Sequence, residues 1–190
     1  FSMNMDRHTL SEFMDLLCGR FDNREQFEQR QAAGDTSFPF AHHVNTICNQ
    51  KISGLPADFP GLFLLEESYY TVQGRTNASP HLFCFTQEAD GVLLTSYDLP
   101  RGLDPKSLSY ETMPEIPFDQ LSPSQKFTPA LYRFQDGGWV GGSESMFSPV
   151  MKFTLFERFF PDRLEVSESM EREGKRVFGY DVPLIYKRTN

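Results

Sequence analysis

The chain has 190 residues, a formal net charge of -8 and 39% hydrophobic residues. Its length predicts a single domain over residues 1–190, large enough to bury a core without disulfide or metal cross-links. The negative charge argues against nucleic acid and against anionic membrane surfaces, because proteins bind both through lysine and arginine. No apolar run approaches the ~20 residues that span a bilayer, so no membrane insertion is expected.

The chain begins with Phe1 rather than methionine, so residues 1–5 are expected to be an expression tag or a disordered start. No secretory signal is visible. Cys18, Cys48 and Cys84 are odd in number and widely spaced, which fits neither a disulfide framework nor a zinc site. Reduced thiols in a cytosol-like compartment are therefore expected.

The N-terminal third of the chain predicts two helices. The first begins with the capping box Thr9-x-x-Glu12, carries apolar residues at helical spacing and ends at Gly19. The second begins at Asn23, with Gln26 three residues on, and continues through "REQFEQRQAA". Because its face is mostly polar, the second helix is expected on the surface.

After Pro39 the sequence changes to strands and turns. The predicted strands are 41–48, 63–72, 81–86, 92–99, 130–134, 139–143, 162–170, 175–180 and 183–188. Short loops with glycine, "QEADG", "QDGG" and "EREG", join three pairs of them as hairpins. Because closure of such a meander removes exposed edges, we predict a mainly β fold. The expected architecture is an antiparallel, lipocalin-like β-barrel (calyx) with one or two N-terminal helices and room for a small ligand.

The Pro-rich stretch 100–129, called the excursion below, holds six prolines. It is too apolar for a disordered linker, and one short helical turn is expected around "PFDQL". A connection of this length is typical of a lid or a binding loop.

Standard catalytic motifs are missing from the sequence: there is no nucleophile elbow, phosphate loop, zinc-protease motif or dinucleotide fingerprint. "GGWVGG" lies within a hairpin, where close approach of strands explains the glycines better than phosphate binding. His42 and His43 diverge on a strand, so no metal site is predicted. Cys48 and Cys84 are expected to be buried and inert.

"FLLEESYY" (63–70) places two adjacent carboxylates, Glu66 and Glu67, on a predicted strand, where neighbouring side chains face opposite sides. An ionised carboxylate buried without a partner costs several kcal/mol. Each glutamate must therefore be solvated, bound to a ligand, or paired, and Arg75 or Arg133 is a candidate partner.

Several stretches resemble the CpeT/CpcT family of phycobiliprotein lyases, in the same order and over nearly the whole chain. The family has a short helix that ends in G-x-F-x-N-x-x-Q, an F-A-H segment, an aromatic-x-E-Q-A-Y strand, a hairpin and a final P-x-E-F-K-R strand. The stretches that resemble these features are "LLCGRFDNREQ" (16–26), "PFAHHV" (39–44), "FLLEESYY" (63–70), "SESMEREGKRVFG" (167–179) and "PLIYKR" (183–188). Glu66 and Tyr69 match the third feature. Beyond it, Pro80 is followed by His81 and Leu82, where the family has Tyr-Arg.

The resemblance implies a barrel that binds an open-chain tetrapyrrole (bilin), phycocyanobilin or phycoerythrobilin, without any tightly bound cofactor. As a lyase it would promote thioether attachment of the bilin to a cysteine of a phycobiliprotein β subunit, in the cytoplasm or in the plastid stroma of an alga. Catalytic roles are expected for Glu66 and Tyr69, since a carboxylate accepts hydrogen bonds from pyrrole N–H groups. Aromatic rings would stack on the bilin and cations would hold its propionates. The residues expected to bind the ligand are Glu67, Arg75, His81, Phe83, Tyr97, Arg133 and Trp139.

Two questions stay open at this point. The family match favours Glu66 as the carboxylate in the cavity, whereas Glu67 and Tyr69 share the more apolar face of the strand with Phe63 and Leu65. The protein is alternatively a non-catalytic, lipocalin-like carrier of a bilin or another hydrophobic small molecule, or an interaction module that forms a homodimer.

Overall fold

The computed structural model describes residues 8–189, and the predicted tag or disordered start at residues 1–5 lies outside this range. The described chain is mainly β, with two α-helices, α1 (Leu10–Leu17) and α2 (Arg24–Ala32). The strands are β1 (Gly19–Asp22), β2 (Phe40–Ile47), β3 (Ile52–Ser53), β4 (Leu62–Val72), β5 (Arg75–Ala78), β6 (His81–Glu88), β7 (Gly91–Asp98), β8 (Ile116–Pro117), β9 (Ser122–Pro123), β10 (Ala130–Gln135), β11 (Gly138–Ser148), β12 (Met151–Phe160), β13 (Arg163–Arg172), β14 (Lys175–Gly179) and β15 (Leu184–Thr189). The 3-10 helices η2 (Asn49–Lys51) and η3 (Phe118–Gln120) lie in connections.

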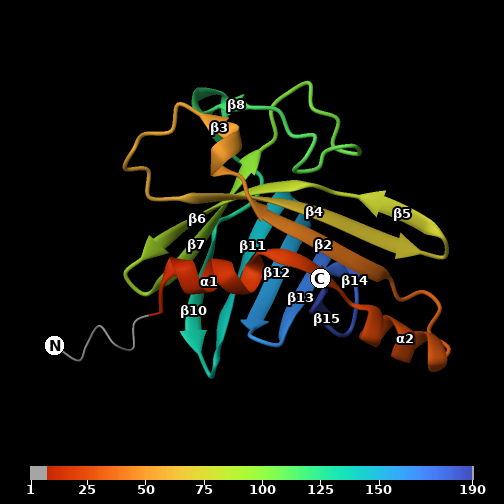
Figure 1. Ribbon diagram of the computed structural model, residues 1–190. Coiled ribbons are helices and arrows are strands. Elements are labelled where there is room, and N and C mark those ends of the chain that lie inside the picture. Colours follow the sequence, from red (N-terminus) through yellow and green to blue (C-terminus); the bar gives the residue numbers. More distant parts are fainter. Residues whose placement is uncertain (1–7, 190) are drawn as a thin grey trace.

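Ten antiparallel strands form a closed barrel (Figure 1). The order around it is β10, β11, β12, β13, β15, β1, β2, β4, β6 and β7, and the pairing of β7 with β10 closes the ring. Strands β5 and β14 pair with the outer parts of β4 and β13. The predicted antiparallel barrel with N-terminal helices is thereby confirmed.

The three predicted hairpins are confirmed as β6–β7, β10–β11 and β13–β14. Asp136 and Gly137, at the tip of β10–β11, have φ angles of 53° and 82°, which a tight two-residue hairpin turn requires. Two strands of the ring were not predicted. Strand β1 lies between the two predicted helices, and β12 follows β11 through a short turn and pairs along its whole length with β13.

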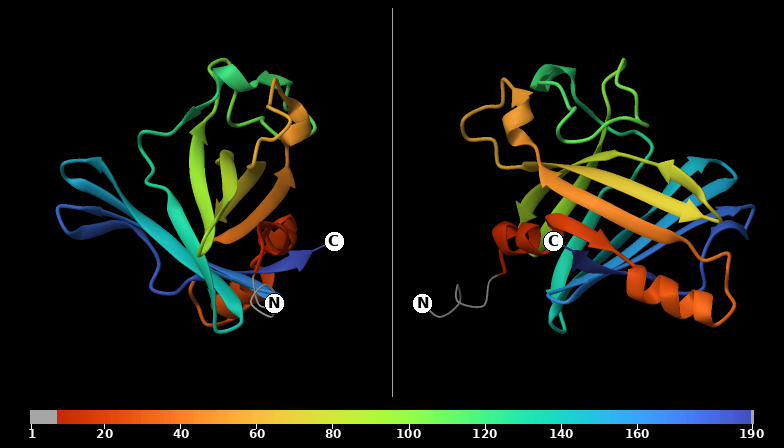
Figure 2. Two further views of the ribbon diagram at one scale, coloured as in Figure 1. Left: turned by 90° about the vertical axis from the view of Figure 1, so that its left-hand side faces the viewer. Right: turned by 45° about the vertical axis from the view of Figure 1, so that its right-hand side comes forward.

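Helix α1 packs across one end of the barrel, as the predicted amphipathic pattern requires. The ring of Phe13 lies 5.2 Å from that of Phe85 and 5.3 Å from those of Tyr132 and Trp139, between ring centroids. Aromatic side chains of three strands thus hold the helix in place. In both views of Figure 2, the tips of the β11–β12 and β13–β14 hairpins project on the side away from α1.

Helix α2 lies on the surface, as predicted, but its first residues do not form the expected cap. Asn23 is buried and makes no capping hydrogen bond. Its side-chain oxygen accepts from the Ala41 N–H at 2.8 Å, and its side-chain nitrogen donates to the Pro39 carbonyl at 3.0 Å. Gln26 binds the backbone at the start of β15 in the same way, at 2.8 and 2.9 Å. Both amides connect the helix to neighbouring strands.

The middle of the excursion covers the outer face of β4 and β6 (Figure 1), whereas Phe127 and Thr128 at its end line the barrel interior. Leu108, Met113 and Ile116 of the excursion are buried against Phe63 and Leu65 of β4, in a hydrophobic cluster separate from the barrel interior. The predicted helical turn in "PFDQL" is present as η3. Strand β4 is therefore buried on both faces, one toward the interior and one beneath the excursion.

We expect Asn23→Ala to lower the free energy of unfolding by about 2 kcal/mol, because it leaves two backbone groups without their hydrogen-bond partner. Urea denaturation measures this change. The control is Gln29→Ala, an exposed amide on the same helix, which should change stability by less than about 0.5 kcal/mol. Equal effects of the two substitutions would contradict the role assigned to Asn23.

Candidate functional site

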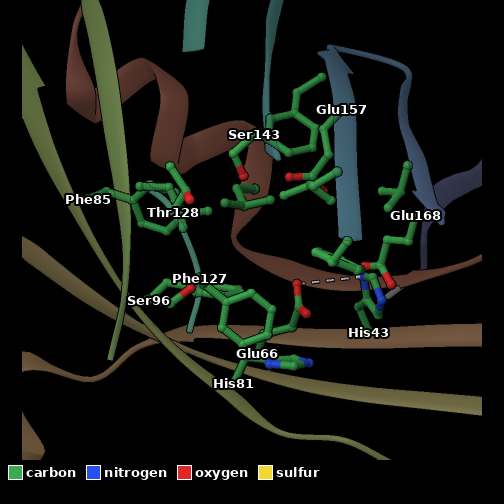
Figure 3. A pocket seen from close by; sticks show the side chains of 17 residues that line it. His43, Glu66, His81, Phe85, Ser96, Phe127, Thr128, Ser143, Glu157 and Glu168 are labelled. Carbon is green, nitrogen blue, oxygen red and sulfur yellow. Dashed lines mark ion pairs between the residues drawn. The ribbon is translucent and has the colours of Figure 1, made fainter. Parts of the chain in front are cut away.

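The barrel interior contains a cavity of about 70 Å³ with mixed walls (Figure 3). Its aromatic side chains are Phe83, Phe85, Phe127, Phe153 and Phe159. Its polar side chains are His43, Glu66, His81, Ser96, Thr128, Ser143, Glu157 and Glu168. Of the described residues that line the cavity, none is lysine or arginine. A cavity with this concentration of carboxyl groups favours a ligand that donates hydrogen bonds or carries positive charge.

The alternation of side chains along β4 shows which of the two glutamates faces the barrel interior. Leu64 belongs to the interior cluster of the barrel, whereas Phe63 and Leu65 belong to the cluster beneath the excursion. Glu66 therefore faces the cavity, and Figure 3 shows its carboxyl group directed toward His43. The apolar face that Glu67 shares is buried as well, but outside the barrel.

Glu67 holds the excursion against the sheet. Its carboxylate accepts hydrogen bonds from the Tyr69 hydroxyl and from the Tyr110 N–H, both at 3.3 Å. Tyr69 stacks on the ring of His42 on the outer face of β2, at 4.5 Å between centroids. Glu66 and Tyr69, the two predicted catalytic residues, thus lie on opposite faces of β4, and the structure does not bring them together.

Three carboxyl groups from different strands share the cavity: Glu66 from β4, Glu157 from β12 and Glu168 from β13 (Figure 3). Burial, followed by the charges of the other two, raises the pKa of Glu66 well above its ordinary value. Burial raises the pKa of Glu157 to about 8, although the hydrogen bond from the Tyr132 hydroxyl opposes the shift. Burial also raises the pKa of Glu168 to about 7. Burial thus favours the protonated form of each group, and a cationic ligand would favour loss of that proton.

Two histidines complete the polar side of the cavity in their neutral form. Burial lowers the pKa of His43 to about 3, and that of His81 to about 4. The ring of His43 stacks on Tyr186 at 4.2 Å, and its Nδ1 lies 3.9 Å from a carboxyl oxygen of Glu66. With a neutral imidazole beside a protonated carboxyl group, this contact is a polar contact rather than an ion pair. Together they can pass a proton to or from a ligand.

Of the predicted ligand-binding residues, the structure brings His81 and Phe83 to the cavity beside Glu66. Their rings stack at 5.6 Å with an angle of 3°. The other predicted residues lie elsewhere. Tyr97 packs on Phe63 and lines a second hollow next to the cavity, and Trp139 is buried beneath α1.

The two predicted arginines do not reach the cavity either. Arg75 is exposed at the start of β5. Arg133 points away from the interior on β10 and forms an ion pair with Asp90, at 3.0 Å between Nη2 and the carboxylate. Neither arginine neutralises Glu66 or Glu67.

His43, Glu157 and Glu168 were not predicted as site residues. The alternation of inward and outward side chains along their strands could have identified them. Glu157 is two residues from the inward-facing Leu155 and Phe159, and Glu168 is two residues from the inward-facing Val166. On β4 the same signal is ambiguous, because both faces of that strand are apolar.

The cavity contains no thiol. Burial raises the pKa of Cys18 to about 11 and those of Cys48 and Cys84 to about 12. All three are free, and none lines the cavity. Within residues 8–189, no helix is long and apolar enough to cross a membrane, and no three acidic, histidine or cysteine side chains are grouped as metal ligands.

The raised pKa of Glu157 makes stability depend on pH. The carboxyl group ionises near its ordinary value of 4.5 in the unfolded chain and at about 8 in the folded chain. Wild-type stability should therefore fall as pH rises from about 4.5 to about 8, because the unfolded state loses its proton first. Relative to wild type, Glu157→Gln should gain about 2 kcal/mol of unfolding free energy between about pH 5 and pH 9, measured with urea.

The matched control for this measurement is Glu144→Gln, an exposed glutamate on the outer face of β11. Its stability difference from wild type should stay constant with pH. A constant or decreasing difference for Glu157→Gln would contradict a protonated carboxyl group in the cavity.

Comparison with known proteins adds no family assignment to this geometry. A scan against protein-family models found no match for the chain, and a search of curated proteins found no significant match. The conclusions about function therefore rest on the cavity itself.

Proposed function

We propose that the protein is a lipocalin-like carrier that binds an open-chain tetrapyrrole at the barrel cavity and presents it to a cysteine of a phycobiliprotein β subunit. The observation that carries the proposal is the convergence of Glu66, Glu157 and Glu168 in an aromatic cavity that has no lysine or arginine among its described lining residues. Buried carboxyl groups without cationic partners are costly to the fold, which fits groups retained for a ligand.

A bilin matches this lining chemically. Its pyrrole rings are flat and apolar, and they carry N–H groups that carboxyl oxygens accept. The rings of Phe83, Phe127 and Phe153 offer faces on which a pyrrole can stack. The enclosed volume of about 70 Å³ admits only part of a four-ring molecule. The remaining rings would then extend over the rim, where an acceptor protein can reach them.

The state of the thiols supports release of the bilin rather than its retention. The cavity has no cysteine, and burial keeps the thiols of this chain protonated. The nucleophile would come from the acceptor. In the addition, the acceptor thiol releases its proton to solvent, its sulfur bonds to one carbon of a bilin C=C bond, and the other carbon gains a proton as the π bond is lost. Glu66, whose pKa burial raises well above its ordinary value, is the candidate donor of that proton and regains one from solvent.

A second candidate function follows from the small volume of the cavity. Three carboxyl groups around about 70 Å³ also suit a carrier for a small aromatic amine, whose ammonium group they would bind. Tryptamine is a suitable probe. Binding of tryptamine without binding of phycocyanobilin would favour this non-catalytic function.

We expect Glu66→Gln to weaken phycocyanobilin binding about tenfold, because it removes a charge-assisted acceptor from the cavity. Absorbance titration measures the dissociation constant. The neighbouring substitution Glu67→Gln lies on the other face of β4 and should leave it within about twofold, while lowering thermal stability through the Tyr110 contact. Equal affinities for both variants and wild type would remove Glu66 from the site.

Transfer is tested by mixing the phycocyanobilin-loaded protein with an apo-β subunit. We expect a thioether adduct to form faster than with free phycocyanobilin, because the carrier positions the bilin. Zinc-enhanced fluorescence of the denatured β subunit measures the adduct. Binding without faster transfer would leave a carrier only, and the absence of any spectral change on mixing protein and bilin would contradict the proposal.

A further inference from the structure

The rim of the cavity is a cluster of phenylalanines with a lysine above it. Phe127 and Phe153, which line the cavity, pack against each other and against Phe147, with ring centroids 5.2–5.7 Å apart within the trio. The Nζ of Lys126 lies 4.1 Å from the centroid of Phe147 and 5.5 Å from that of Phe127. Two aromatic faces thus hold this ammonium group beside the entrance.

The segment that carries Lys126 is fixed across the rim by hydrogen bonds at both ends. The Ser124 N–H donates to the Ser96 carbonyl of β7 at 2.8 Å, and the Thr128 N–H donates to the Ser145 hydroxyl of β11 at 2.9 Å. Between them, the Ser124 hydroxyl accepts from the Lys126 N–H at 3.0 Å. The position of the lysine is therefore set by the barrel, which lowers the entropy cost of using it to bind a ligand.

The charge of Lys126 is available to a ligand. Within residues 8–189, no carboxylate forms an ion pair with it, whereas Lys152 nearby in the fold is paired with Glu171 at 3.3 Å. After burial, the charge of Lys126 is the next cause that lowers the pKa of His81, so its field reaches the cavity lining.

A second hollow, of about 170 Å³, lies at the same rim. It shares four lining residues with the cavity: His81, Phe83, Ser96 and Phe127. Asp98 also lines this hollow and would repel an anion at that position. The hollow offers space for the part of a ligand that the cavity does not enclose, and Lys126 supplies a positive charge beside it.

We propose that Lys126 binds a carboxylate of the ligand at the rim, so that the ligand enters with its N–H-rich rings toward Glu66 and its acidic side chains outward. This inference rests on the proposed function and gives the bilin one orientation. The described cavity lining offers a propionate no lysine or arginine, whereas the ammonium group over Phe147 attracts it.

The test compares two ligands that differ only in their carboxylates, phycocyanobilin and its dimethyl ester, on the intact chain. Lys126→Ala should weaken phycocyanobilin binding about fivefold and leave binding of the ester unchanged, because only the free acid has an anion to lose. Lys126→Arg should restore the affinity for the acid. The control is Lys152→Ala, which removes the same charge from a lysine already paired with Glu171 and should affect neither ligand.

Each other result contradicts a different statement. An equal loss for acid and ester would mean that Lys126 shapes the rim without binding a carboxylate, and no loss for either would exclude it from the site; both overturn this inference and leave the proposed function in place. If neither compound binds to the wild-type protein, the proposed function fails, and the inference fails with it.

Discussion

The rest of the structure depends on one constraint: strand β4 is buried on both faces. Its alternate side chains enter two separate hydrophobic clusters, the barrel interior and the cluster beneath the excursion. A one-residue shift in the register of β4 would place Glu66 against Leu108 and Met113 and leave Glu67 in the cavity. Burial of apolar residues on both sides makes that shift costly, so the position of the candidate site is set by packing and not by the site's own polar contacts.

The interior combines elements that oppose each other energetically. Around Phe13, aromatic rings from α1 and three strands pack closely and stabilise one end of the barrel. Further along the same interior, three carboxyl groups are buried without cationic partners, and each is driven toward its neutral form. The helix-covered end stabilises the fold, and the opposite part carries the groups that favour a ligand. This division is typical of a binding protein whose site is costly to maintain.

Strand and hairpin positions followed from local patterns because each depends on alternation and turn residues within a few positions. The tertiary partners did not. Asn23 and Gln26 have the spacing of a helix cap, yet their amides bind strands that are distant in the sequence, as the Gln26 contact with Pro183 illustrates. Periodicity established that Glu66 and Glu67 face opposite sides, but both faces are apolar, and only the path of the excursion decides which is interior. Residue type alone led to the prediction of Arg75, Arg133 and Trp139 as ligand-binding residues. Residue type carries no information about whether a side chain on a strand points into the barrel or out of it.

The burial of Cys48 and Cys84 beneath the excursion has a further consequence. Both thiols belong to the cluster that Leu108, Met113 and Ile116 seal from solvent, whereas Cys18 lies at the end of α1. An alkylating reagent reaches the first two only when this cluster opens. The labelling rates of Cys48 and Cys84 therefore measure how often this cluster opens. They report that motion separately from any event inside the barrel.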